Sequence, residues 1–245
     1  MNRPVALIAR CRSGLSGVRG PTASVSLGAL AGFVLLTLIT AGRHDAPLSV
    51  DVRLLSWSVA HRPDVAVAVA RGATATGTGV VPYALAVLAG AVAGRTARQR
   101  LVAAAASLFC LGAGQALRYA VMHLLARARP PVQDWATHAS GWSYPSGHAT
   151  TAAITAALLV TAVLLRSPPG RTLLALAVGC WGMAVGLTRV YLGVHWFSDV
   201  VGGWLFAMAW FGMCACVAAR RLPGRAPEVT DTTDLEDHQT GRESE

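Results

Sequence analysis

Long apolar stretches alternate with short polar connections along the whole chain. A helix that crosses a bilayer needs roughly 20 predominantly apolar residues. Six segments fit this pattern: 24–42, 79–95, 101–122, 148–165, 172–190 and 197–219. The second is the shortest and contains Pro82, which is tolerated near the start of a helix. The pattern predicts an all-α, six-transmembrane helical bundle.

Two apolar regions have competing interpretations. The first segment resembles a signal-peptide core behind a basic leader, but its length and the lack of a clear A-x-A site after it favour a retained helix. The region 49–75 is moderately apolar and carries Arg53, Arg62 and Asp64. We interpret it as a helical segment that lies on the membrane surface rather than as another span.

Composition supports a membrane environment and argues against nucleic acid as a partner. The chain is 53% hydrophobic and 13% charged, with a mean hydropathy of +0.48, whereas soluble domains have about 25% charged residues. All 21 basic residues are arginine, and they punctuate apolar segments instead of forming one basic face. We therefore expect the bilayer as a partner and no nucleic acid. The absence of lysine also excludes a P-loop.

The arginines predict the direction of the helices and the limits of the domains. Four arginine groups fall on one side if six helices cross, and the positive-inside rule assigns this side to the cytoplasm; they lie within 3–19, 95–100, 166–171 and 220–225. The segments expected to face outward are 43–78, 123–147 and 191–196. We expect a basic cytoplasmic leader (1–23), a six-span membrane domain (24–221) and an acidic, disordered cytoplasmic tail (222–245), so both termini are cytoplasmic.

Three polar motifs fall on the predicted outer side. They are Arg127-Ala128-Arg129-Pro130, Pro145-Ser146-Gly147-His148, and the run from Thr188-Arg189 through His195 to Asp199. Ionisable residues at membrane depth are costly and by default indicate a functional site. No C-x-x-C pair or H-E-x-x-H motif occurs, and the five cysteines suggest packing rather than a disulfide framework, so we expect no metal and no cofactor.

These residue types suit phosphoryl transfer. Arginine forks match phosphate oxygens and stay charged. If a helix begins near His195, Asp199 shares its face and can orient the ring, which leaves the other nitrogen free to attack phosphorus. Ser146 resembles an N-cap at a natural anion seat, where His148 can protonate the leaving oxygen.

The order R-P, P-S-G-H and [ST]-R-x5-H-x3-D resembles the type 2 phosphatidic acid phosphatase superfamily, over residues from about Arg118 to Asp199. The resemblance implies a metal-independent lipid phosphatase in which His195 is the nucleophile, Asp199 orients it and His148 is the acid and then the base. It implies that Arg129, Arg189, Ser146 and the Gly147 amide hold the phosphate.

One position departs from this family pattern. The family has lysine seven residues before the Arg-Pro arginine, where this chain has Met122. Arg118, four residues earlier on the same helix face, and Arg127 in the loop are candidate replacements for the missing phosphate contact. The alternative for Arg118 is a pairing with a carbonyl or with Asp199, and the alternative for the protein is a catalytically impaired site.

The expected function is hydrolysis of a lipid phosphate on the outer face of the plasma membrane. Candidate substrates are phosphatidate-like lipids, phosphatidylglycerophosphate and polyprenyl diphosphates. Flanking aromatics such as Trp142 and Trp196 are typical of an interfacial belt, which sets the site at headgroup level. Vanadate-dependent haloperoxidases share the histidine–arginine layout, but they are soluble, and six spans speak against them. His123 and His138 are expected to be solvated loop residues.

Overall fold

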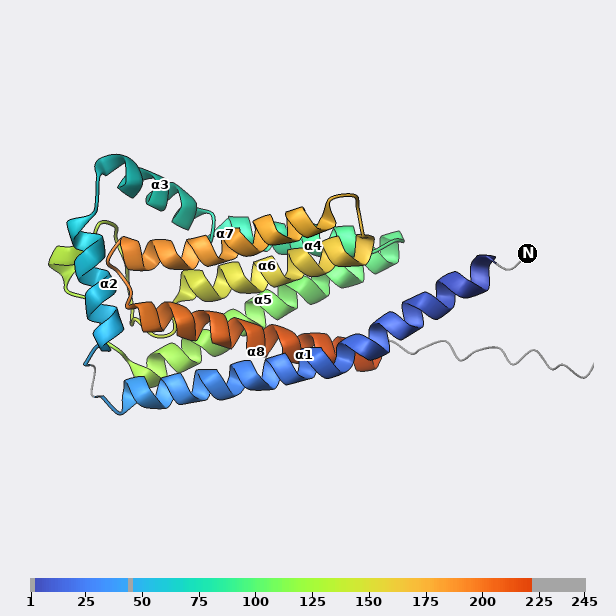
Figure 1. The fold of residues 1–245 in the computed structure, drawn as a ribbon, viewed down its shortest axis with the longest axis horizontal. Helices are drawn as coiled ribbons and strands as arrows, with labels where there is room; N and C mark the ends of the chain where they lie inside the picture. The colour runs from blue at the N-terminus through green and yellow to red at the C-terminus, as the bar shows by residue number, and fades with distance from the viewer. Residues whose placement is uncertain (1–2, 44–45, 222–245) are drawn as a thin grey trace, which may run out of the picture.

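A computed structural model describes residues 3–43 and 46–221 of the 245-residue chain. Within these ranges the protein is all-helical (Figure 1). The helices are α1 (Arg3–Ala41), α2 (Ser49–Ala60), α3 (Asp64–Ala75), α4 (Val80–Ala93), α5 (Ala97–Leu125), the short 3-10 helix η1 (Val132–Asp134), α6 (Gly147–Arg166), α7 (Arg171–Tyr191) and α8 (Phe197–Arg221). The predicted tail, 222–245, lies outside the described residues.

The long helices form one elongated bundle with α6 at its centre. Helix α6 packs against α4, α7 and α8, while α1 packs along α8 and α4 along α5. Among the described residues, five helices are long and apolar enough to cross a membrane. Large side chains on the bundle surface are exposed, for example Leu27 at 67%, Phe109 at 72% and Leu173 at 74%. Such faces suit contact with lipid rather than water, and the predicted multi-pass helical bundle is confirmed.

The sixth span differs in form from the prediction. Helix α4 has 14 residues, or about 21 Å of rise, which is shorter than a bilayer core. Helices α3 and α4 together are long and apolar enough to form one span, with a bend of 51° between them. The predicted surface segment 49–75 is therefore two helices with different arrangements. Helix α2 lies across the end of the bundle, whereas α3 forms a bent pair with α4 (Figure 1).

The predicted boundary between leader and first span is not a break in the helix. Helix α1 continues from Arg3 to Ala41, and its apolar part begins at Thr22. Local sequence sets other ends. Thr96 accepts a hydrogen bond from the Gln99 amide (3.2 Å) and so caps the start of α5. Helix α5 ends at Leu125, and the next residue, Ala126, adopts a left-handed conformation with φ of +45°.

The connections sort to two ends of the bundle. Helix α2 and the connections α5–α6 and α7–α8 lie at one end, which we call the site end (Figure 1). The short connections α4–α5 and α6–α7 lie at the opposite end. All three polar motifs therefore gather at the site end, while Arg98 and Arg171 belong to the opposite end.

Candidate active site

Backbone hydrogen bonds hold the three motifs against one another. The Ser143 amide donates to the Arg127 carbonyl (2.9 Å), which ties the second motif to the first. The Ser146 amide donates to the Asp199 carbonyl (3.0 Å), which ties the second motif to the third. Because these groups are paired in the fold itself, the relative positions of the motifs do not depend on flexible side chains.

The turn between α7 and α8 requires a glycine. Gly193 has a φ of +72°, and a Cβ there would collide with the carbonyl oxygen of Asp134 in the α5–α6 connection. This close approach brings the two long-separated connections together and fixes the turn that carries His195.

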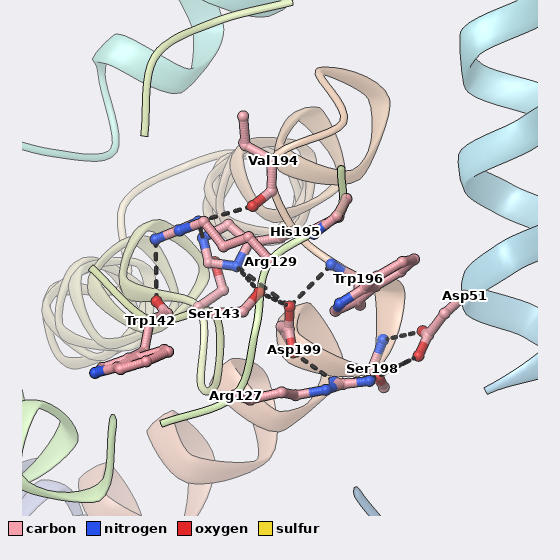
Figure 2. A network of polar contacts seen from close by, with 12 residues as sticks. Asp51, Arg127, Arg129, Trp142, Ser143, Val194, His195, Trp196, Ser198 and Asp199 are labelled. Carbon is pink, nitrogen blue, oxygen red and sulfur yellow. Dashed lines mark hydrogen bonds and ion pairs between the residues drawn. The ribbon is translucent and has the colours of Figure 1, made fainter. Parts of the chain in front are cut away.

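The two ring nitrogens of His195 face chemically different partners. Nε2 lies 3.0 Å from Nη1 of Arg129, and Nδ1 lies 3.4 Å from Oδ2 of Asp199 (Figure 2). A guanidinium can only donate hydrogen bonds, so Nε2 must be the acceptor and the ring proton belongs on Nδ1, facing the carboxylate. This tautomer leaves a lone pair on Nε2, which is the arrangement that a nucleophilic imidazole needs.

The contact between His195 and Asp199 arises differently from the expectation. His195 does not lie on a helix, because α8 begins at Phe197. Asp199 instead sits in the first turn of α8, where its Oδ2 accepts a hydrogen bond from the Trp196 amide (2.8 Å). The same carboxylate thus stabilises the start of the helix and reaches back to the histidine.

The surroundings keep His195 neutral. Burial and the positive charges of Arg129 and Arg189 together lower the pKa of His195 to about 4, although the hydrogen bond and charge of Asp199 act in the opposite direction. The side chain is 3% exposed. At neutral pH the imidazole is therefore unprotonated.

A buried group of acidic and basic side chains lies on the Nδ1 side of His195; we call it the carboxylate cluster (Asp51, Arg127, Ser198 and Asp199). Nη1 of Arg127 donates to Oδ1 of Asp199 (2.6 Å), and Nη2 donates to Oδ2 of Asp51 (3.1 Å). Figure 2 shows Arg127 stretched between the two acids. Both terminal nitrogens of Arg127 thus have a carboxylate partner, and each buried carboxylate has a cationic donor.

The prediction that Arg127 contacts phosphate does not agree with this geometry. Its side chain is buried, and both terminal nitrogens are engaged, one with Asp51 and the other with Asp199 and the Ser198 hydroxyl (2.8 Å). Arg127 therefore supports the carboxylate that contacts His195.

Three other arginines lie on the opposite side; we call them the arginine cluster (Arg118, Arg129 and Arg189). Every ion pair found within residues 46–221 involves Arg127 or His195, so no member of the arginine cluster has a carboxylate at ion-pair distance there. Burial lowers the pKa of Arg129; Asp199 opposes this shift and the positive charge of Arg118 adds to it. Arg118 and Arg189 are buried and Arg129 is half-buried. Cations placed in this way without counterions are suited to binding an anion.

Arg189 is the most isolated of the three. It is 3% exposed, and Nη1 donates to the Thr74 hydroxyl of α3 (3.2 Å). Its Nε is buried and has no hydrogen-bond partner among the described residues. A buried guanidinium N–H without an acceptor is unfavourable, so an anion that accepts from it would stabilise the fold.

Arg118 reaches the second motif. Nε donates to Gln115 (2.8 Å), and Nη1 lies 3.4 Å from the sulfur of Met122. A Cβ on Gly147 would lie 3.4 Å from the guanidinium carbon of Arg118, so the guanidinium lies against this glycine. The alternative pairing with a carbonyl or with Asp199 is not found among its contacts in the described residues.

The start of α6 offers further donors for an anion. Ser146 is the N-cap position, as predicted, but its hydroxyl does not cap the helix. That hydroxyl is fully buried and lacks a partner among the described residues. The first amides of a helix, here from Gly147 onward, have no acceptor within the helix. His148 on this turn is within electrostatic range of His195 and of all three members of the arginine cluster.

Sequence reasoning missed several residues of this site. Ser143 is fully buried and donates from its hydroxyl to Oδ2 of Asp199, while Asp51 and Ser198 complete the carboxylate cluster. The only signal for Asp51 was an acid in the first turn of a helix. Its contact with α8 bridges 147 positions, and no local pattern reports such a distance. No group of side chains able to hold a metal ion is found within the described part of the chain.

Comparisons with known proteins find a similar family and a similar fold. Residues 103–223 match the family model described as PAP2 superfamily. A solved transmembrane PAP2 type phosphatidylglycerolphosphate phosphatase from Bacillus subtilis superimposes with a TM-score of 0.64 at 25% identity, over 81% of this chain and 99% of that chain.

Two curated relatives match more locally. Phosphatidylglycerophosphatase B of Bacillus subtilis is 30% identical over 109 residues, which are 42% of this chain and 52% of the relative. An undecaprenyl-diphosphatase of Sulfolobus acidocaldarius is 42% identical over 67 residues, 26% of this chain and 28% of the relative. The chain thus matches about half of the first relative's length and less of the second.

Proposed function

This chain carries a PAP2 superfamily domain, and we propose that it is a membrane phosphatase that hydrolyses the phosphate monoester or diphosphate of a lipid. The single observation that carries the proposal is the meeting of the arginine cluster with Nε2 of His195, through the 3.0 Å contact from Arg129. An electron-rich nitrogen among unpaired cations suits attack on a phosphorus whose oxygens those cations hold.

In the proposed first step, Nε2 of His195 attacks phosphorus and the bond to the lipid oxygen breaks. The leaving oxygen takes a proton from His148, and the phosphoryl group becomes attached to His195. Asp199 stabilises the positive charge that develops on the ring through the Nδ1 contact of 3.4 Å. Water then attacks phosphorus, the bond between phosphorus and Nε2 of His195 breaks, His148 takes a proton from the water, and inorganic phosphate leaves.

Binding requires one local exchange of partners. All the guanidinium N–H groups of Arg129 already have acceptors: the carbonyls of residues 140, 141, 142 and 194, and Nε2 of His195. A phosphate oxygen would replace Nε2 as the acceptor at Nη1, which frees the nitrogen lone pair as the substrate arrives. The substrate would also accept from Arg189, Arg118, the Ser146 hydroxyl and the Gly147 amide.

The names of the relatives support phosphatidylglycerophosphate or a polyprenyl diphosphate as the substrate. The test is phosphate release by the purified protein from phosphatidate, phosphatidylglycerophosphate and a polyprenyl diphosphate. We expect release that EDTA does not reduce and that vanadate, a mimic of the transferring phosphoryl group, blocks. No release from any of the three would refute the proposal in favour of an impaired site.

We also propose that the site end faces outward at the plasma membrane. The opposite end carries exposed arginines such as Arg98, Arg166 and Arg171, and the positive-inside rule favours the cytoplasm for it. In a variant without the native cysteines, Gln133→Cys should react with an impermeant maleimide on intact cells and Arg98→Cys should not. The reverse labelling would overturn the orientation.

A further inference from the structure

We propose that Asp51, on helix α2, is a positioning residue for His195 and acts through Arg127 and Asp199. The inference rests on the proposed role of His195 as nucleophile. It extends the active site to a helix that lies before the matched family region, residues 103–223, and across the end of the bundle (Figure 1).

Asp51 makes more contacts than the first turn of a surface helix requires. It is 1% exposed, and one oxygen accepts from its own helix start at the Leu48 amide (3.0 Å). The other contacts leave the helix. Oδ1 accepts from the Ser198 amide (2.8 Å), and Oδ2 accepts from the Ser198 hydroxyl (2.7 Å) and from Nη2 of Arg127 (3.1 Å).

The position of Asp51 determines how Arg127 meets Asp199. One end of the guanidinium is held by Asp51, so the other end presents Nη1 to Oδ1 of Asp199 at 2.6 Å (Figure 2). Oδ2 of Asp199 then remains turned toward Nδ1 of His195, the Ser143 hydroxyl and the Trp196 amide. A buried carboxylate with both oxygens assigned in this way has little freedom to turn away from the histidine.

Asp51 also divides the charge of Arg127 between two acids. If Arg127 had Asp199 alone, its whole positive charge would act on that carboxylate and weaken it as an acceptor for the Nδ1 proton. A weaker acceptor gives less stabilisation of the cationic ring that forms when His195 attacks. Geometry and charge thus predict the same outcome, a slower chemical step.

Helix α2 has a separate structural anchor that serves as a control. Ser58 is also 1% exposed, and its hydroxyl donates to the Leu55 carbonyl (2.9 Å) and faces the Val190 carbonyl of α7 (3.5 Å). It has no contact with the carboxylate cluster among the described residues. Its hydroxyl also accepts from Nη2 of Arg62 (3.1 Å). Ser58→Ala therefore disturbs the packing of α2 without removing a direct contact of the carboxylate cluster or of His195.

The experiment compares Asp51→Asn, Asp51→Glu and Ser58→Ala in the purified full-length protein. Asp51→Asn should lower kcat by about tenfold to a hundredfold and change KM by less than about threefold, because the phosphate donors are untouched. Asp51→Glu, which keeps the charge, should retain more activity than Asp51→Asn. Ser58→Ala should keep wild-type kcat. Wild-type kcat in a folded Asp51→Asn protein would overturn the inference.

A double-mutant cycle with Arg127→Ala separates positioning from general stability. If Asp51 acts through Arg127, Asp51→Asn should cost little further activity in the Arg127→Ala background. Full additivity of the two losses would mean that Asp51 acts independently of Arg127, and the inference would be wrong.

Nitrogen NMR of the His195 ring gives a readout without turnover. Asp51→Asn should shift the Nδ1 signal of His195 and Ser58→Ala should not. If the wild-type protein releases no phosphate, the proposed function fails, and the NMR comparison still decides whether Asp51 influences the ring. An unchanged Nδ1 signal in Asp51→Asn would refute that influence.

Discussion

The carboxylate cluster and the arginine cluster are neighbours at the site end, yet their buried charges are arranged in opposite ways. In the carboxylate cluster, Arg127 lies between Asp51 and Asp199, at 3.1 Å and 2.6 Å. In the arginine cluster, Arg189 is equally buried and binds only the Thr74 hydroxyl among the described residues. The first arrangement pairs its arginine with carboxylates of the protein, whereas the arginines of the second have no carboxylate partner among the described residues.

This difference assigns different roles to arginines that look alike in sequence. Removal of a partner from a compensated buried group leaves an unpaired charge and costs stability. Removal of an uncompensated cation relieves the protein of a desolvated charge and costs function instead. Removal of an arginine from the carboxylate cluster should therefore lower the stability of the protein. Removal of an arginine from the arginine cluster should lower activity without lowering stability.

His195 is the residue where the clusters meet, and its replacement should have the largest effect. His195→Ala removes the attacking nitrogen, which no general base can replace. Turnover should fall by at least about three orders of magnitude while the protein still inserts in the membrane. His123→Ala, at an exposed position in the last turn of α5, is the matched control and should be fully active. Near-normal turnover by His195→Ala would contradict the proposed mechanism.

The direct test of the comparison is Arg189→Met beside Arg127→Met. Arg189→Met should lower turnover by about a hundredfold to a thousandfold, because a charge held against the transferring phosphoryl group is lost. Its unfolding temperature in detergent should be equal to or above that of the wild type. Arg127→Met should instead lose about 3–5 kcal/mol of stability, because two buried carboxylates lose their partner.

Phosphate provides the control for this pair. Inorganic phosphate or vanadate should raise the unfolding temperature of the wild type, since a ligand that binds only the folded state stabilises it. The rise should vanish in Arg189→Met. If Arg189→Met is strongly destabilised and still responds to vanadate, the arginine cluster is structural and the contrast between the clusters is wrong.

Replacement of Arg118 should lower turnover over a wider range than replacement of Arg189. Its guanidinium lies against Gly147, where the proposed substrate would bind. Arg118→Ala should lower turnover by about one to three orders of magnitude if it supplies the cation missing at Met122. Met122→Lys in that background should restore part of the activity. Normal turnover in an inserted Arg118→Ala protein would show that Met122 has no replacement there.

The sequence predicted the helical fold and the three local motifs better than it predicted the residues that contact those motifs from distant parts of the chain. Apolar length alone located the long helices, because the bilayer imposes it. Local spacing singled out His195, His148 and Asp199, and the structure brings His195 and Asp199 into contact; their catalytic roles stay predictions. It failed for Arg127, whose neighbourhood suggested phosphate, because its true partner Asp51 is 76 positions away. The bend between α3 and α4 was also missed. Tertiary packing, and not hydropathy, determines which neighbouring helix extends a short apolar helix into a span.

The smallest expected effect is a change in the pKa of His195. This pKa reports the opposing influences of the two clusters on the ring. Burial, Arg129 and Arg189 lower this pKa and Asp199 raises it, and the net result is a pKa of about 4. The free protein should therefore keep a neutral ring at pH 5.5, where an unperturbed histidine with a pKa near 6.5 is mostly protonated. Because the unfolded chain binds this proton and the folded chain does not, the contribution of His195 to stability is present above about pH 6.5. It falls as the pH drops from there toward 4.

Variants on each side should move this pKa in opposite directions. Arg129→Met removes a positive charge and should raise the pKa of His195 by about one unit, whereas Asp199→Asn removes the negative charge beside Nδ1 and should lower it by a similar amount. Ring-nitrogen NMR over a pH series measures both shifts directly, and Ser58→Ala should leave the pKa unchanged. Shifts of the same sign in the two variants would mean that burial alone sets the protonation of His195. The opposed clusters would then have no part in preparing the nucleophile.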